Sequence, residues 1–403
     1  MQDDWTIGRR LTLNVGLRYD VSLGAIGDRM EPFPPFRPTT VDPDLLNFGP
    51  RFGFAYSWNE KTVIRGGWGK YYGQPANFQV YIPYSTWIQV TPVTLNDRRP
   101  NFAADPYNGV VPTYDSIIAS GARRDVSMLD PESYHTQHSY QTSIGVQRQV
   151  GETMAFQADY AYNASRGEGF FSRNSNLSYN PATGANYPFT DLSHLPYPDW
   201  GTVTTTYGNG WSNYHSLQTA FTKRFSNHWQ ASANYTLSGF WDSVSAPDVD
   251  FALQPDFGGE YTLGVGDQRH RATLNGIWEI GWGLQASGIY FYGSGLRYLT
   301  NWGVDLRQVG ASGENRLRPD GTIVPRNNFV GEPIHRFDVR FQKRVRLGRV
   351  TADGIVEVFN VLNHANYGSY TTSEVSPAYA TPNVSLQQPF QPRMAQFAFR
   401  INF

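Results

Sequence analysis

Apolar and polar residues alternate in long runs along this sequence. In the run 10–22, every odd position from Leu11 to Val21 is apolar or aromatic, and the even positions are polar or Gly. A period of two residues gives a β-strand one apolar and one polar face. Strands of globular proteins typically have ~5–6 residues, whereas a strand that crosses a bilayer at ~45° needs ~9–11. The length of the runs therefore predicts membrane-spanning strands.

Short and long connections alternate between these runs. The runs lie at 10–22, 49–59, 62–72, 138–150, 153–166, 211–225, 229–238, 267–280, 284–297, 335–347, 350–362 and 394–403. Turns such as WNEK and LGRV are short, whereas segments such as 73–136 and 168–210 are long and rich in Pro, Tyr, Asn and Gly. Outer-membrane barrels have short periplasmic turns and long extracellular loops. With a partial strand before residue 8, we expect an all-β protein, an antiparallel up-and-down transmembrane β-barrel portion of about 12–13 strands.

Composition excludes several other classes. Lys plus Arg total 33 against 34 Asp plus Glu, so no basic field exists to attract nucleic acid. The chain has no Cys, which excludes disulfides and thiolate metal sites. No apolar run approaches the ~18 residues of a transmembrane helix. The N-terminus MQDDWTIGRR lacks the basic and apolar regions of a signal peptide.

Three cations fall on the apolar face of the expected strands. Arg148 and Lys223 lie within a few residues of tight turns, where a long side chain can reach the headgroup region. Lys343 lies deeper by this count, where a Lys costs roughly 2–4 kcal/mol. We therefore expect Lys343 to be the least favourable of the three.

Five stretches together resemble a known family. They are GPRFGFAYSWNEKTVIRGGWGKYYG, SYQTSIGVQRQVGETMAFQADYAYNASRG, SNYHSLQTAFTKRFSNHWQASANYTLS, DQRHRATLNGIWEI and VEVFNVLNHANYG. In this order they resemble the C-terminal barrel half of TonB-dependent outer-membrane receptors of the Oar-like group, which carries a carboxypeptidase-regulatory-like domain. The resemblance implies a bacterial outer-membrane protein that takes up a ligand, with extracellular loops contacting that ligand and with outer-membrane lipid around it.

The resemblance also implies what this stretch of sequence represents. Residues 1–403 would be a single C-terminal part of the receptor barrel, without the plug domain, TonB box, signal peptide and earlier strands. TonB would be reached only through that missing N-terminal part. An odd number of strands cannot close as an antiparallel barrel. We therefore expect an incompletely closed sheet, from a C-terminal fragment or a truncated gene.

The last strand carries a further expectation from the resemblance. The chain ends MAQFAFRINF, and in such receptors a terminal aromatic residue is read by the outer-membrane assembly machinery. The predicted assembly signal consists of Phe397, Phe399, Ile401 and Phe403.

Aromatic residues of the long loops are candidate ligand contacts, because their rings can stack on a sugar, a chelator or a peptide. They are Tyr81, Tyr84, Trp87, Tyr107, Tyr114, Tyr187, Tyr197 and Trp200. The alternative, which we favour, is that they pack the loops against one another. The spacing of His135 and His138 does not favour a metal pair on a strand, and no serine elbow or HExxH motif occurs. We expect no enzyme activity, cofactor or metal.

Two other functions remain open at this point. The chain could be a self-contained, porin-like passive barrel of about twelve strands, or, more remotely, a secreted all-β carbohydrate-binding protein. The direction of the apolar faces separates the membrane hypotheses from the last one. Ten residues should share a lipid-facing surface rather than a common core: Leu11, Leu13, Val15, Leu17, Trp229, Tyr235, Leu237, Phe397, Phe399 and Ile401.

Overall fold

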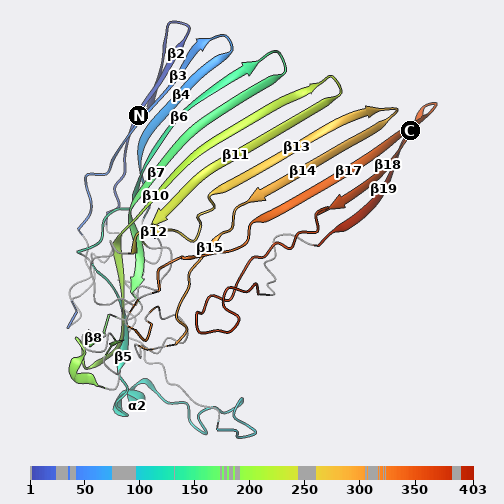
Figure 1. Ribbon diagram of the computed structural model, residues 1–403. Helices are drawn as coiled ribbons and strands as arrows, with labels where there is room; N and C mark the ends of the chain where they lie inside the picture. Colours follow the sequence, from blue (N-terminus) through green and yellow to red (C-terminus); the bar gives the residue numbers. More distant parts are fainter. Residues whose placement is uncertain are drawn as a thin grey trace.

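A computed structural model shows one curved, open β-sheet with loops gathered at one end (Figure 1). The structure describes residues 2–23, 35–36, 42–74, 97–130, 132–172, 175–176, 179–180, 185–186, 191–243, 260–304, 306, 316, 318–320, 322, 324–383 and 392–403. Among them, 13 strands follow one another in a continuous antiparallel path. Helix makes up only 3% of the described residues. The all-β, up-and-down prediction of about 12–13 strands is therefore confirmed.

The strands of this path are long. They are β1 (Gln2–Ile7), β2 (Leu11–Tyr19), β3 (Phe48–Asn59), β4 (Thr62–Tyr72), β6 (His138–Val150), β7 (Met154–Ser172), β10 (Trp200–Ser226), β11 (Trp229–Asp242), β13 (His270–Gly281), β14 (Leu284–Gly293), β17 (Ile334–Leu347), β18 (Val350–Phe359) and β19 (Met394–Asn402). Smaller elements lie among the loops: α2 (Tyr114–Ala119), β5 (Arg124–Leu129), β8 (Tyr179–Asn180), β9 (Ala185–Asn186), η1 (Leu192–His194), β12 (Thr262–Leu263), β15 (Arg297–Tyr298) and β16 (Phe329–Val330). No helix in the described part of the chain is long and apolar enough to cross a membrane.

Tight turns join the strands at one end, which is the top of Figure 1. The turn between β10 and β11 places Asn227 and His228 at φ of 51° and 69°. A two-residue turn with both φ values positive matches the right-handed twist of a hairpin. Gly8, Gly151 and Gly348 supply positive φ in three other turns. The alternation of short and long connections thus places all hairpin turns at one end and all long loops at the other.

Two strands extend beyond their predicted ends. β7 and β10 continue past residues 166 and 211 as a ribbon on the loop side, where 168–210 was expected to be a loop. β5 pairs with β10 in parallel, from Arg124 opposite Trp200 to Leu129 opposite Thr206. The prediction that the connection spans all of 168–210 was wrong at both ends. The Thr-rich segment 202–206 forms a strand because β5 supplies a partner.

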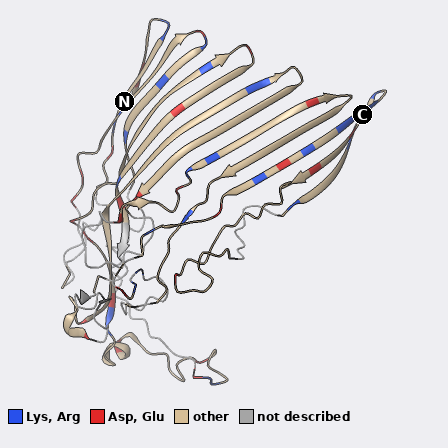
Figure 2. Cartoon of the chain, in the orientation of Figure 1, with Lys and Arg blue, Asp and Glu red and all other residues tan. Residues whose placement is uncertain are grey.

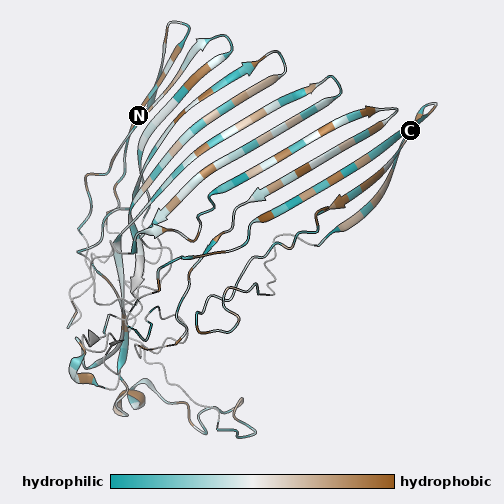
Figure 3. Cartoon of the chain, in the orientation of Figure 1, coloured by the Kyte–Doolittle hydropathy of each residue, from teal (hydrophilic) through white to brown (hydrophobic). Residues whose placement is uncertain are grey.

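The register gives the sheet an apolar and a polar face. Leu13 lies opposite Phe54, Tyr235 opposite Ala272, and Phe397 opposite Val356, so the ten residues predicted to share a surface belong to one continuous face. Eight of the ten are at least 38% exposed, and they do not converge on a core. Figure 3 shows the alternation along the strands. This exposure is what a lipid-facing surface shows when lipid is left out.

The edges of the sheet are open. β1 and β19 are the first and last strands of the path, do not pair with each other in the described structure, and run in the same direction. The expectation of an incompletely closed sheet is confirmed.

Candidate functional site

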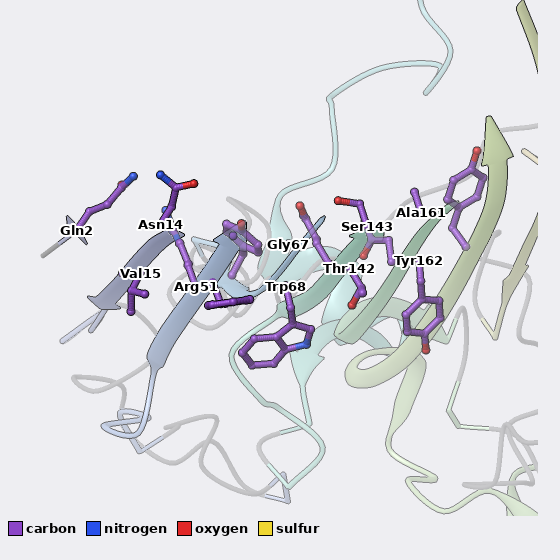
Figure 4. Close-up of a pocket in the computed structure, with 17 residues that line it drawn as sticks. Gln2, Asn14, Val15, Arg51, Gly67, Trp68, Thr142, Ser143, Ala161 and Tyr162 are labelled. Atoms are coloured by element: carbon purple, nitrogen blue, oxygen red, sulfur yellow. The ribbon is translucent and has the colours of Figure 1, made fainter. Parts of the chain in front are cut away.

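A shallow hollow of about 560 Å³ lies against the sheet between β2 and β10. Asn14, Gly53, Gly67, Ser143 and Ala161 are direct neighbours in register across five strands. Their small side chains leave space on the polar face. Figure 4 shows Asn14 and Ser143 pointing to one side of the sheet, and Val15, Trp68 and Tyr162 to the other.

Longer polar side chains border this row on the loop side. Arg51, Gln141, Asn163 and Tyr214 line the same hollow. The Arg51 guanidinium lies 4.5 Å from the centre of the Tyr71 ring, a cation–π contact. The hollow therefore offers hydrogen-bond donors, acceptors and aromatic surface, and it is suited to a polar occupant.

An ion pair crosses three strands on the side of the tight turns. Arg65 of β4 contacts Asp159 of β7, with Nη2–Oδ1 and Nη2–Oδ2 distances of 3.1 and 3.2 Å. Gly145 of β6 lies between them, and a Cβ there would be 1.9 Å from Asp159 Oδ1. The pair forms only because position 145 has no side chain.

Further ion pairs line the polar face at the other end of the sheet. Arg344 Nε lies 2.7 Å from Asp353 Oδ1, and Arg340 Nη1 lies 3.4 Å from Glu357 Oε1. Figure 2 shows these charges along β17 and β18. A face with such charges suits water or a polar partner, as in the interior of an outer-membrane barrel.

Two of the three cations predicted on the apolar face, Lys223 and Lys343, donate hydrogen bonds to the tight turns. Lys223 Nζ donates to Ser226 O at 2.8 Å and to Trp229 O at 2.9 Å, and it lies 4.0 Å from the Trp229 ring centre. Lys343 lies opposite Leu284, the first residue after the neighbouring turn, and its Nζ donates to Trp282 O. The expectation that Lys343 lies deep was wrong, because the stagger between hairpins brings that turn beside it.

Two of the predicted loop contacts lie in a small loop core. Trp200 is 3% exposed and packs with Phe36, Val126 and Val203, and Tyr197 lies against this cluster. Asn176 holds the segment 197–201 in place. Its Nδ2 donates to the carbonyls of Tyr197, Trp200 and Gly201, and its Oδ1 accepts from Tyr197 N. No local pattern marks Asn176 or Phe36 in the sequence, because their partners lie far away along the chain.

The remaining loop aromatics are not brought together. Tyr107 lies half-buried in the segment 101–110, and Tyr114 is 49% exposed at the start of α2. Tyr81, Tyr84, Trp87 and Tyr187 lie outside the described residues. Among the described residues, no group of three or more His, Asp or Glu side chains is placed to hold a metal ion.

The proposed assembly residues lie on an exposed edge strand. Phe397, Phe399 and Phe403 are 77%, 69% and 97% exposed, and Ile401 is 45% exposed. Among the strands that the structure describes, β19 pairs on one side only, with β18.

Residues 1–314 match the outer membrane beta barrel domain family. The chain belongs to this family. Membership places the protein in the bacterial outer membrane and accounts for the apolar face of the sheet. None of the curated proteins compared with the chain matches it.

Solved structures share the fold of this outer membrane beta barrel. The siderophore receptor PirA from Acinetobacter baumannii is 12% identical, with a TM-score of 0.53 over 99% of this chain and 44% of that one. The outer membrane transporter YddB from Escherichia coli is 12% identical, with a TM-score of 0.51 over 97% of this chain and 42% of that one. The ferripyoverdine receptor of Pseudomonas aeruginosa is 11% identical, with a TM-score of 0.51 over 99% of this chain and 37% of that one. This chain therefore spans less than half the length of each.

Proposed function

We propose that this chain is the C-terminal barrel part of a TonB-dependent outer-membrane receptor of the Oar-like group, which takes up a ligand from outside the cell. The observation that carries the proposal is the open sheet with a polar, charged wall. Its edges run in the same direction, so an antiparallel barrel would need an odd number of further strands. The resemblance of five stretches to Oar-like receptors supports the choice of group, and the likeness to larger receptors and transporters supports uptake. The ligand stays open.

In this proposal residues 1–403 form one part of the barrel, and a plug and TonB box lie in a preceding part of the receptor. The polar wall between β2 and β10 would face the plug or the ligand path. The last strand would be recognised by the assembly machinery through Phe397, Phe399, Ile401 and Phe403. A self-contained barrel is less consistent with the separated edges of β1 and β19.

The test uses the gene in its natural reading frame, with an epitope tag in a long loop. We expect the outer-membrane product to be much larger than the 45.4 kDa of this chain and to bind the periplasmic domain of TonB. A 45.4 kDa product that does not bind TonB and conducts ions in planar bilayers would instead establish a passive barrel.

A further inference from the structure

Four histidines lie at one level on the apolar face. Each histidine lies 11 or 12 residues before the residue at which its strand ends at a tight turn. The separations are 12 for His138, 11 for His215, 11 for His270 and 12 for His335. At ~3.3 Å per residue and a tilt of ~45°, this separation is roughly 26 Å along the membrane normal. The apolar band of an outer-membrane barrel is ~25 Å tall. The histidines therefore mark the boundary of the band on the side of the long loops.

Three of them are held by tyrosines in the same way. The hydroxyls of Tyr160, Tyr235 and Tyr290 lie 2.7, 2.8 and 2.8 Å from Nδ1 of His215, His270 and His335. A hydroxyl that donates to Nδ1 fixes the neutral ring with its proton on Nε2. In the described part of the chain, Nε2 of these three rings has no hydrogen-bond partner. In that tautomer, each ring presents an Nε2–H donor at the membrane boundary.

A groove of about 870 Å³ lies on the apolar face, on the side of His335 that faces the tight turns. Small residues of β11, β13 and β14 form its floor, including Ala233, Gly276, Ala286 and Gly288. Trp229 and Trp278 line its end near the tight turns, and Tyr290 and Phe337 line its other end. Tyr290 therefore belongs to the groove and also holds His335.

No carboxylate at the described strand positions of this face, from β2 to β19, would repel an anionic head group. In the described strands β2 to β19, the register places no carboxylate on the apolar face. Asp3 of the edge strand β1 is the acidic residue that lies on it. Lys70 of β4 and Arg166 of β7 lie on this face outside the groove, next to His138: Lys70 Nζ is 4.6 Å from the Tyr72 ring centre, and Arg166 is opposite His138. Cationic and N–H donor groups bind phosphate oxygens, and an apolar groove accepts a hydrocarbon chain.

We propose that the groove between β10 and β17 is a lipid site for the phosphorylated glycolipid of the outer leaflet. One acyl chain lies over Gly288 and Gly276, and His335 Nε2 donates to a phosphate of the head group. The glycolipid fits because the histidines lie on the extracellular side, whose leaflet carries sugar phosphates. The proposal depends on the outer-membrane location and not on the transported ligand.

The test measures bound lipid by native mass spectrometry on the protein extracted from outer membranes, then delipidated and reconstituted. The probes are lipopolysaccharide with its lipid A phosphates, the same lipid after dephosphorylation, and phosphatidylglycerol. We expect retention of the phosphorylated glycolipid to fall about tenfold in His335→Gln and in Ala286→Phe, which fills the groove. Tyr290→Phe keeps the His335 imidazole but removes the hydroxyl that holds it, so lipid retention should fall less than in His335→Gln.

Matched controls separate lipid binding from folding. His228→Gln changes a histidine of a tight turn, and Ala352→Phe adds a ring to the apolar face of β18 outside the groove; both should retain lipid as the wild type does. Heat-modifiable mobility on gels identifies folded variants. Unchanged retention in folded His335→Gln and Ala286→Phe would overturn the site, leaving the Tyr–His pairs as structural links. Equal retention of all three probes would overturn the phosphate contact.

Discussion

Gly145 shows how one missing side chain permits an interaction between strands that are not neighbours. Gly145→Ala would place a Cβ 1.9 Å from Asp159 Oδ1, so Asp159 has to move away from Arg65. The pair itself is worth little because Arg65 is 44% exposed, but overpacking costs about 1–3 kcal/mol. We expect a loss of this size in urea unfolding in detergent. Gly354→Ala is the control, because its Cβ would meet no atom within 4 Å; equal losses in both variants would contradict the steric explanation.

Tyr134, on the loop side of β6, provides a pH test. Burial, together with the charge of Asp44, raises the pKa of Tyr134 to about 12. An unfolded Tyr titrates near ~10, so the folded state holds this proton more tightly. The stabilisation is complete below pH ~10 and is lost as the pH rises to about 12. The difference between the ultraviolet pH titration curves of the wild type and of Tyr134→Phe reports the Tyr134 hydroxyl, and its midpoint should lie at about pH 12. A midpoint of about 10 would show that the hydroxyl is solvated.

Among the elements, the loop cluster around Asn176 depends on a single amide. Asn176→Ala would remove four hydrogen bonds to backbone groups of Tyr197, Trp200 and Gly201. Each buried group left without a partner costs about 1–3 kcal/mol, so this loop should open while the strands stay folded. Limited proteolysis should cut near 191–199 at least ~10-fold faster, since cleavage follows the open population. Asn234→Ala, an exposed position of β11, should behave as the wild type.

The last strand allows folding and targeting to be separated. Phe403 is 97% exposed, so deleting it should change the free energy of unfolding by less than the ~1.5–3 kcal/mol of a fully buried ring. If the terminal ring is an assembly signal, outer-membrane yield in cells should fall far more than refolding yield in detergent. The comparison is made with the gene expressed in its natural reading frame. Equal cellular yields with and without Phe403 would exclude the targeting role.

The strands could be predicted from the sequence, and the loop contacts could not. Alternation fixes the face of each residue locally, so runs such as 62–72 and 138–150 match β4 and β6. The parallel pairing of β5 with β10 and the contacts of Phe36 and Asn176 join distant segments, and no local period encodes them. The Tyr–His pairs lie between these cases. Their spacing from the turns is visible in the sequence, but strand stagger was needed to place them at one level.

At the scale of the whole molecule, the two faces can be tested with adjacent residues of β11. The chain has no Cys, so single substitutions give a clean background. Ser232→Cys lies on the polar face and Ala233→Cys on the apolar face, as their partners Asn275 and Leu274 show. In outer membranes, a water-soluble maleimide should label position 232 at least ~10-fold faster than 233, because a thiol in hydrocarbon rarely forms the reactive thiolate. The reverse order would contradict the assignment of faces.

The shared direction of β1 and β19 also limits what the sheet can join. Copies inserted the same way up all present edges that run in one sense, so two of them meeting sideways could pair only in parallel. A hairpin-built sheet favours antiparallel neighbours, and exposed edges are otherwise common starting points for aggregation. A second copy of this sheet is therefore a poor partner for either edge. A segment whose outer strands run antiparallel to β1 and to β19 could pair with both edges.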